Sequence, residues 1–392
     1  MKLAEEFFAP SPPGGSAGEA HGAAWSNPGD LRMHTYVPAD LPAGAPLVVV
    51  LHGCGQSAEA LAIGASWLQL ADLHGFALLC PEQKRANNFN TCFNWFAPED
   101  SRRGGGEACS IVQMTQWILD NRALDPARVF VAGLSAGGAM TNVLLATYPD
   151  IYAAGGVIAG LPFAAARNMA EAFVAMQRGS VRSAGELAEA VLAARQGARW
   201  PKVSVWHGDA DSTVAPSNAS AIINQWTDAR HISTPPLHEY LSGHERRRWL
   251  DSSGDIVLEL NIVPGMNHAW PLATEGRDAC GAPGPYLAAV NISASAELLR
   301  FWGIHAEQKA AAPKPEQLDR PLQLPRAAKR PPARDLEIAA PSAEQPQTDM
   351  LTPSAAEPDI GTTEPSIGKR GLAARLGGFL RRLLRKGFGH RH

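Results

Sequence analysis

Residues 128–140 constrain the fold of this chain more than any other stretch of the sequence. β-branched and aromatic residues at 129–131 predict a buried strand, a Gly-Leu-Ser-Ala-Gly turn follows, and small and aliphatic residues at 139–148 predict a helix. A serine at the apex of such a turn has a strained backbone, and flanking glycines let strand and helix pack closely. This context favours a nucleophilic Ser135 over an ordinary glycine turn.

Short apolar runs alternate with helical patterns through most of the chain. Runs typical of strands in the centre of a parallel sheet occur at residues 46–51, 75–80, 129–131, 156–159 and 203–206. Helical patterns occur at residues 57–74, 111–122, 139–148, 218–229 and 291–302. The alternation predicts an α/β fold with a mostly parallel sheet that helices cover on both faces.

Three segments depart from this alternation. Residues 31–37 alternate apolar and polar side chains and predict an edge strand. Residues 246–250 and 256–263 flank an Asp-Ser-Ser-Gly turn and predict a hairpin. Residues 161–200 are Ala-rich with two candidate helices, which we interpret as a small helical insertion above the sheet, a candidate cap.

The two ends of the chain differ in composition from its middle. Residues 1–28 are rich in Gly, Pro, Ser and Ala and predict a flexible leader before a catalytic domain at 29–305. Residues 306–366 are dominated by Ala, Pro and polar residues, bury too little apolar area to offset their ordering entropy, and are predicted to be disordered. Residues 367–392 place apolar side chains on one helical side and basic ones largely on the other, which predicts a basic amphipathic helix.

Charge, cysteine usage and hydropathy narrow the class of protein. The net charge is −3, so no nucleic-acid partner is expected. No apolar run approaches the roughly 18 residues of a membrane span, and the N-terminus lacks the pattern of a secretory signal, which favours the cytoplasm. The five cysteines include no Cys-x-x-Cys pair, so neither a structural zinc nor another metal or cofactor is expected.

A serine hydroxyl becomes an effective nucleophile when a base accepts its proton and an acid orients that base. In chains with this turn the expected order is serine, acid, histidine. Candidate acids follow the strand at 203–206, at the sheet edge where α/β proteins bind ligands. We predict that Asp211 is the acid, with Asp209 as the alternative or as a cap of the turn.

The candidate base is His268. It lies in a loop bounded by glycine and proline after the strand at 256–263, and this context suits a mobile imidazole. His244 and His238 are the alternatives, and both lie in a polar stretch that predicts an exposed surface.

The oxyanion of a tetrahedral intermediate needs two backbone N–H donors. Ala136, next to the serine, supplies one of them. The glycine-rich loop at 52–56 is expected to supply the other, from Cys54 first and Gly55 second. The alternative reading of this loop is a plain tight turn.

Six motifs occur together and in order, at residues 51–56 (Leu-His-Gly-Cys-Gly-Gln), 81–83 (Pro-Glu-Gln), 90–96 (Asn-Thr-Cys-Phe-Asn-Trp-Phe), 133–138 (Gly-Leu-Ser-Ala-Gly-Gly), 206–211 (Trp-His-Gly-Asp-Ala-Asp) and 265–270 (Gly-Met-Asn-His-Ala-Trp). With them the chain resembles the polyhydroxybutyrate depolymerase esterases, an α/β-hydrolase family that includes feruloyl and acetylxylan esterases. The resemblance covers about residues 30–304. It implies a serine hydrolase of carboxylic esters with Ser135, Asp211 and His268 as the triad.

The resemblance has further implications for the site. It implies that Cys54 and Cys92 form a disulfide in an oxidising compartment, and that Trp95 and Trp270 line the substrate pocket. Many relatives are extracellular, whereas this chain lacks a visible signal. Gly55 also stands where relatives commonly carry threonine or another polar residue, a change that we expect to leave the oxyanion loop intact.

The expected function is hydrolysis of poly- or oligo(3-hydroxybutyrate) esters through an acyl-serine. The alternatives are a feruloyl or acetylxylan type of esterase, a polyester synthase, which the serine at 135 disfavours because synthases use cysteine, and a non-catalytic granule or membrane scaffold. The basic helix at 367–392 is expected to dock on a polyester granule or an anionic membrane.

Overall fold

The computed structural model of the protein describes residues 2–6, 25–241, 243–276 and 278–304. The chain divides into two units, Met1–Gln308 and Lys309–His392, and every described residue belongs to the first. The linker predicted at 306–366, the basic helix predicted at 367–392 and most of the predicted leader therefore lie outside the described residues, and these domain assignments stay predictions.

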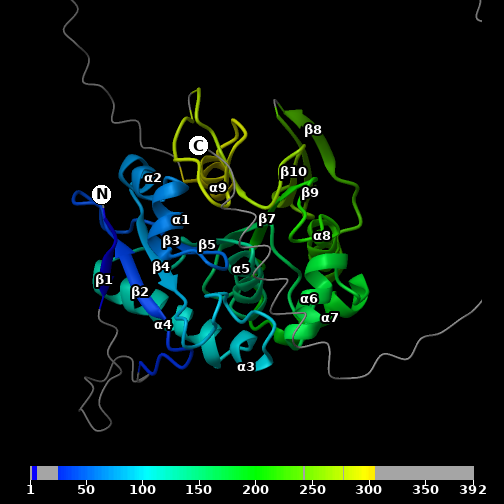
Figure 1. Ribbon diagram of the computed structural model, residues 1–392, viewed down its shortest axis with the longest axis horizontal. Coiled ribbons are helices and arrows are strands. Elements are labelled where there is room, and N and C mark those ends of the chain that lie inside the picture. Colours follow the sequence, from blue (N-terminus) through cyan, green and yellow to red (C-terminus); the bar gives the residue numbers. More distant parts are fainter. Residues whose placement is uncertain (1, 7–24, 242, 277, 305–392) are drawn as a thin grey trace, which may run out of the picture. The chain divides into compact units, whose positions relative to one another are not determined.

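The described residues form a ten-stranded sheet (Figure 1). Its order is β1 (Ala4–Glu6), β2 (Arg32–Tyr36), β4 (Ala77–Glu82), β3 (Leu47–Leu51), β5 (Val129–Leu134), β6 (Ala154–Ile158), β7 (Lys202–Gly208), β10 (Ile256–Val263), β9 (His244–Leu250) and β8 (Leu237–Leu241). The strands from β4 to β10 in this order are parallel, and antiparallel strands flank them on both sides. The predicted mostly parallel sheet and the predicted hairpin are confirmed.

Helices cover both faces of the sheet because the central strands are apolar on both sides. Val48 and Val50 of β3 pack on one face, where the covering helices are α1 (Ala58–Gly64), α2 (Trp67–His74) and α9 (Ala294–Trp302). Val49 and Leu51 pack on the other face, beneath α4 (Gly106–Arg122), α5 (Ala136–Thr147), α7 (Ala184–Ala194) and α8 (Ser217–Ala229). Two further helices pack against these, α3 (Pro98–Ser101) beside α4 and α6 (Met169–Arg178) beside α8.

The structure differs from the sequence-based expectations at the edges of the sheet. Ala4–Glu6, assigned to the flexible leader, forms strand β1 and pairs with β2, so the strand expected at the edge has neighbours on both sides. The two helices of the insertion are present, but α7 packs against α5 and α8 and thus extends a helix layer. Neither departure could be found from local patterns, because both depend on pairing between distant segments.

A second, small sheet lies after the loop that contains His268. It pairs β11 (Trp270–Leu272) with β12 (Leu287–Ala289) in parallel. The Trp270 N–H donates to the Tyr286 carbonyl at 2.8 Å, and Tyr286 has a positive φ of 62°. The rings of Tyr286 and His268 form a T-shaped pair, with their centroids 6.1 Å apart and an angle of 81° between their planes. The segment after β10 therefore returns to the site.

Candidate active site

Ser135 lies at the turn between β5 and α5. Its φ of 58° and ψ of −118° are a strained conformation for a residue other than glycine. A Cβ at Gly133 would collide with the backbone of Gly137, and one at Gly137 would collide with the Leu51 carbonyl. Strand and helix therefore approach more closely than side chains at these two positions would permit, as the sequence predicts. Ser135 retains 8% of its surface exposed.

Asp211 follows the end of β7 and is buried. Its Oδ1 accepts the backbone N–H groups of Thr213 at 2.8 Å and Val214 at 2.9 Å. Its Oδ2 lies 2.7 Å from Nδ1 of His268. Burial by itself would raise the pKa of Asp211, but hydrogen bonds from His207 and His268 prevail and hold it well below its usual range. The carboxylate is therefore ionised at neutral pH.

Hydrogen bonds of the backbone and of the Asp209 side chain join the loops after β7 and β10. Asp209 Oδ1 accepts the Gly265 N–H at 2.6 Å, and Ala210 N–H donates to the Met266 carbonyl at 3.2 Å. A Cβ at Gly208 would collide with that same carbonyl. Asp209 is exposed and holds the two loops together, so the structure pairs His268 with Asp211 and gives Asp209 a different role.

His268 retains 8% of its surface exposed. Its Nδ1 donates to Asp211, which leaves Nε2 as the nitrogen available to a hydroxyl. No hydrogen bond joins Ser135 Oγ to His268 within the described residues. Distances between nucleophile and base are often longer before a substrate binds. The structure thus brings acid and base into contact and places the serine at the end of β5, in the same parallel sheet.

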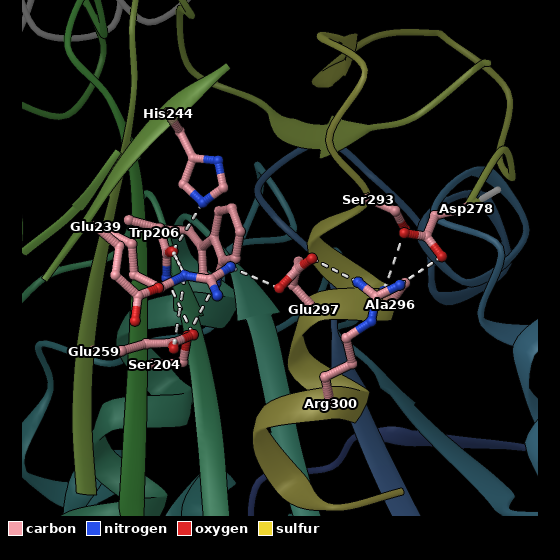
Figure 2. A network of polar contacts seen from close by, with 12 residues as sticks. Ser204, Trp206, Glu239, His244, Glu259, Asp278, Ser293, Ala296, Glu297 and Arg300 are labelled. Carbon is pink, nitrogen blue, oxygen red and sulfur yellow. Dashed lines mark hydrogen bonds and ion pairs between the residues drawn. The ribbon is translucent and has the colours of Figure 1, made fainter. Parts of the chain in front are cut away.

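The alternative histidines lie elsewhere. His238 is exposed on β8, 3.6 Å from Glu245. His244, which was expected on the surface, is buried in a polar network that joins β9 and β10 to α9 (Figure 2). Its Nε2 lies 3.1 Å from Asn261 Oδ1, and the network continues through Arg246 to Glu297. The expectation is wrong for His244 because side chains of β10 and α9 cover this part of β9 and supply partners for His244 Nε2 and Arg246.

His207 is a residue of the site that the sequence analysis missed. It is fully buried at the end of β7, and its Nε2 lies 3.2 Å from Asp211 Oδ2, the oxygen that His268 also contacts. The motif Trp-His-Gly-Asp-Ala-Asp contained the signal, since the histidine precedes the acid by four residues. Only the turn brings the two side chains together.

The candidate oxyanion loop follows β3 and lies beside the serine. A Cβ at Gly53 would stand 3.5 Å from the Cβ of Ser135. The Gly55 N–H is already engaged, with the Asn90 carbonyl at 2.8 Å. Among the described residues, the N–H groups of Cys54 and Ala136 have no hydrogen-bond partner. The structure thus favours Cys54 over Gly55 as the second donor.

A second segment, residues 83–94, supports this loop. Cys92 forms a disulfide with Cys54. Beneath the segment, the buried Glu107 accepts hydrogen bonds from Asn94 N–H at 2.7 Å and from Gln83 Nε2 at 2.5 Å. Burial, with the nearby charge of Asp100, raises the pKa of Glu107 to about 8 in spite of these donors.

The two tryptophans expected to line the pocket belong to the core. Trp270 is fully buried, lies edge-on to Trp67 with ring centroids 5.9 Å apart, and donates from Nε1 to Ser295 Oγ. Trp95 is 4% exposed and packs edge-on to Phe96 in the core cluster beneath α4. Helices and strands that the motifs do not reveal cover both rings, and a role of either ring in lining the substrate pocket stays a prediction.

The described residues hold no cluster of three or more His, Cys, Asp or Glu that could bind a metal ion. None of their helices has the length and apolarity needed to cross a membrane.

Known proteins match this chain in sequence and fold. The model of the family described as "Esterase PHB depolymerase" matches residues 33–232. A poly(3-hydroxyalkanoate) depolymerase C from Paucimonas lemoignei is 40% identical over 284 residues, which cover 71% of this chain and 68% of that protein. A feruloyl esterase B from Thermothelomyces thermophilus is 35% identical over 231 residues, covering 57% and 77%. The solved acetyl xylan esterase from Aspergillus awamori has the same fold, with a TM-score of 0.59 at 23% identity, over 72% of this chain and 97% of that chain.

Proposed function

The chain belongs to the PHB depolymerase family of esterases and is a carboxylic-ester hydrolase with an α/β-hydrolase fold, and we propose that it works through an acyl-serine formed on Ser135. The observation that carries the proposal is the contact of 2.7 Å between Asp211 Oδ2 and His268 Nδ1, at the strand ends where Ser135 also lies. An ionised carboxylate on Nδ1 holds the imidazole with a free Nε2, as a general base requires.

The proposed reaction has two halves. In the first, His268 Nε2 accepts the hydroxyl proton while Ser135 Oγ bonds to the ester carbonyl carbon, and the N–H groups of Cys54 and Ala136 stabilise the oxyanion. Collapse breaks the bond to the alcohol oxygen, which leaves with the proton from His268. In the second half, water gives a proton to His268 and attacks the acyl-serine. The acid is released and Ser135 regains its proton.

We propose that the substrate is a poly- or oligo(3-hydroxybutyrate) ester. The 40% identity to a poly(3-hydroxyalkanoate) depolymerase supports this class over the feruloyl and acetylxylan alternatives, whose representatives are less similar. The buried and hydrogen-bonded acid also argues against a non-catalytic scaffold. An ionised carboxylate with this many donors is expensive to bury and contributes little to packing.

Hydrolysis assays on wild type and Ser135→Ala test both proposals. We expect wild type to cleave p-nitrophenyl butyrate and 3-hydroxybutyrate oligomers, with Ser135→Ala slower by several orders of magnitude, about 10⁶-fold in a comparable triad. Cleavage of methyl ferulate or acetylated xylan alone would move the substrate to the alternative class. Equal rates for the two variants would exclude the serine mechanism.

The location of the protein is a separate proposal. The Cys54–Cys92 disulfide supports an oxidising compartment, and thus the extracellular alternative, over the cytoplasm that the sequence favours.

We propose that residues 367–392 dock on a polyester granule or an anionic membrane. Co-sedimentation of wild type and of a chain lacking residues 368–392 with granules and with anionic vesicles tests this, and unchanged binding after the deletion would refute it.

A further inference from the structure

Asp211 Oδ2 lies between two imidazoles. His268 Nδ1 contacts it at 2.7 Å from the loop after β10, and His207 Nε2 contacts it at 3.2 Å from the end of β7. The side chains of His207 and Asp211 are both fully buried. The proposed mechanism uses only one of these imidazoles, so the second has no assigned role.

The surroundings of His207 determine which of its two ring nitrogens is the hydrogen-bond donor. Nε2 also lies 3.0 Å from the Val214 carbonyl, so it faces two oxygens and must carry a hydrogen. Nδ1 is buried without a hydrogen-bond partner in the described part of the chain. Nε2–H is therefore the hydrogen-bond donor of this imidazole, and it faces the Val214 carbonyl and Asp211 Oδ2 together.

This arrangement is expensive if His207 serves only to fill space. A buried nitrogen without a partner loses its hydration and gains nothing, whereas an apolar side chain would fill the same volume at no such cost. The contacts that compensate for the orphaned Nδ1 are those of Nε2, with the Val214 carbonyl at 3.0 Å and with Asp211 Oδ2 at 3.2 Å.

We propose, on the basis of the serine mechanism above, that His207 is a positioning residue that donates from Nε2 to Asp211 Oδ2 and fixes the carboxylate for His268. The remaining groups that face the carboxylate are the N–H groups of Thr213 and Val214, which bind Oδ1. Asp209 is directed to Gly265 instead. His207 and His268 thus define the position of Oδ2 from two sides.

The donation also keeps Asp211 ionised when His268 takes up a proton. It is among the causes that lower the pKa of Asp211. Without it the carboxyl would be protonated at a higher pH, and it would be free to rotate away from His268. Turnover would fall, while substrate binding would change little.

Three substitutions of His207 separate donation from packing. A glutamine places its amide nitrogen near the position of Nε2, an asparagine places it near Nδ1, and a leucine has no donor. We expect His207→Gln to keep kcat within about threefold, and His207→Asn and His207→Leu to lose about 10- to 100-fold, the loss of one charge-assisted hydrogen bond. In the last two variants KM should stay near that of wild type, and the acid limb of kcat/KM against pH should move to higher pH.

His244→Leu is the matched control. His244 is also buried, has an unpartnered Nδ1 and directs Nε2 at an oxygen, but that oxygen belongs to Asn261. We expect this variant to have a lower melting temperature and an unchanged pH profile. Melting temperatures of all variants show whether a loss of turnover merely follows a loss of folded protein.

The outcomes decide between roles. Retention of kcat and of the pH profile by His207→Leu, or equal losses in His207→Gln and His207→Asn at equal melting temperature, would overturn the proposal. The assays use p-nitrophenyl butyrate, with Ser135→Ala beside them. If wild type and Ser135→Ala hydrolyse it equally, the serine mechanism itself fails. If Ser135→Ala loses activity but the His207 variants keep the kcat and pH profile of wild type, the serine mechanism stands and only this inference is refuted.

Discussion

Asp211, in the loop after β7, and Glu107, in the first turn of α4, are both buried carboxyl groups, yet their pKa values shift in opposite directions. Burial raises both. Asp211 accepts hydrogen bonds from two imidazoles and two backbone N–H groups, and its pKa falls. Glu107 accepts them from amides only and lies near the negative charge of Asp100, and its pKa rises to about 8.

The comparison shows what distinguishes a carboxylate that serves the reaction from one that supports a loop. Burial is common to both and therefore does not identify the candidate catalytic acid. The kind of hydrogen-bond donor does identify it. An imidazole can take up a proton, and its positive charge then stabilises the ionised carboxylate, whereas an amide stays neutral. We expect four experiments to test this difference, in order of decreasing effect.

Asp211→Asn should have the largest effect. The amide has the shape of the carboxylate but no charge, and its nitrogen favours the wrong tautomer of His268. We expect kcat to fall by about 10⁴-fold with little change in KM. Steady-state kinetics on p-nitrophenyl butyrate measure this, and a fall of less than tenfold would remove Asp211 from the mechanism. Glu107→Gln should keep most of the turnover in the same assay.

Loss of the Cys54–Cys92 disulfide should have the next largest effect. This bond joins the oxyanion loop to residues 83–94, the segment that Glu107 supports. The bond closes a loop with a sequence separation of 38 residues. We expect Cys54→Ala/Cys92→Ala to lower the free energy of unfolding by about 2–4 kcal/mol. Kcat should fall as well, because the Cys54 N–H loses its anchor. Urea titration measures the first effect, with Cys280→Ala, which breaks no disulfide, as control.

The pH dependence of stability should separate the two acids. The folded-state pKa of Glu107 lies above its unfolded value of about 4.5, so folding takes up a proton there and stability falls as pH rises from 4.5 toward about 8. Asp211 has the opposite shift, so its contribution is present above its usual pKa and is lost in acid.

In wild type we therefore expect the free energy of unfolding to fall by about 1–3 kcal/mol between pH 6 and 8. In Glu107→Gln this fall should be absent. Urea titrations of wild type and variant at both pH values measure the difference. A wild-type stability that does not fall over this range would show that the amide donors outweigh burial.

Asp209→Asn should have the smallest effect. Asp209 is exposed and accepts one backbone N–H, from Gly265. We expect a loss of about 1 kcal/mol in the free energy of unfolding and a kcat within threefold of wild type. Thermal unfolding and steady-state kinetics measure both. A loss of turnover near that of Asp211→Asn would show that the acid was assigned to the wrong aspartate.

Much of the fold and the chain order of the site could be read from local sequence. Ser135 needs only a strand, a glycine turn and a helix in succession, and these depend on neighbouring residues. The parallel sheet follows from short apolar runs between helical patterns, which reflect burial on both faces. The order of serine, acid and histidine then placed Asp211 and His268 at strand ends.

Only the tertiary structure decided which side chains face each other. It separated Asp211 from Asp209, because the turn after β7 directs one to His268 and the other to Gly265. It brought His207 against Asp211 and buried Trp270 beneath α9 and α2. The physical reason is that the direction of a side chain in a turn, and what covers it, depend on strand register and packing between segments far apart in the chain.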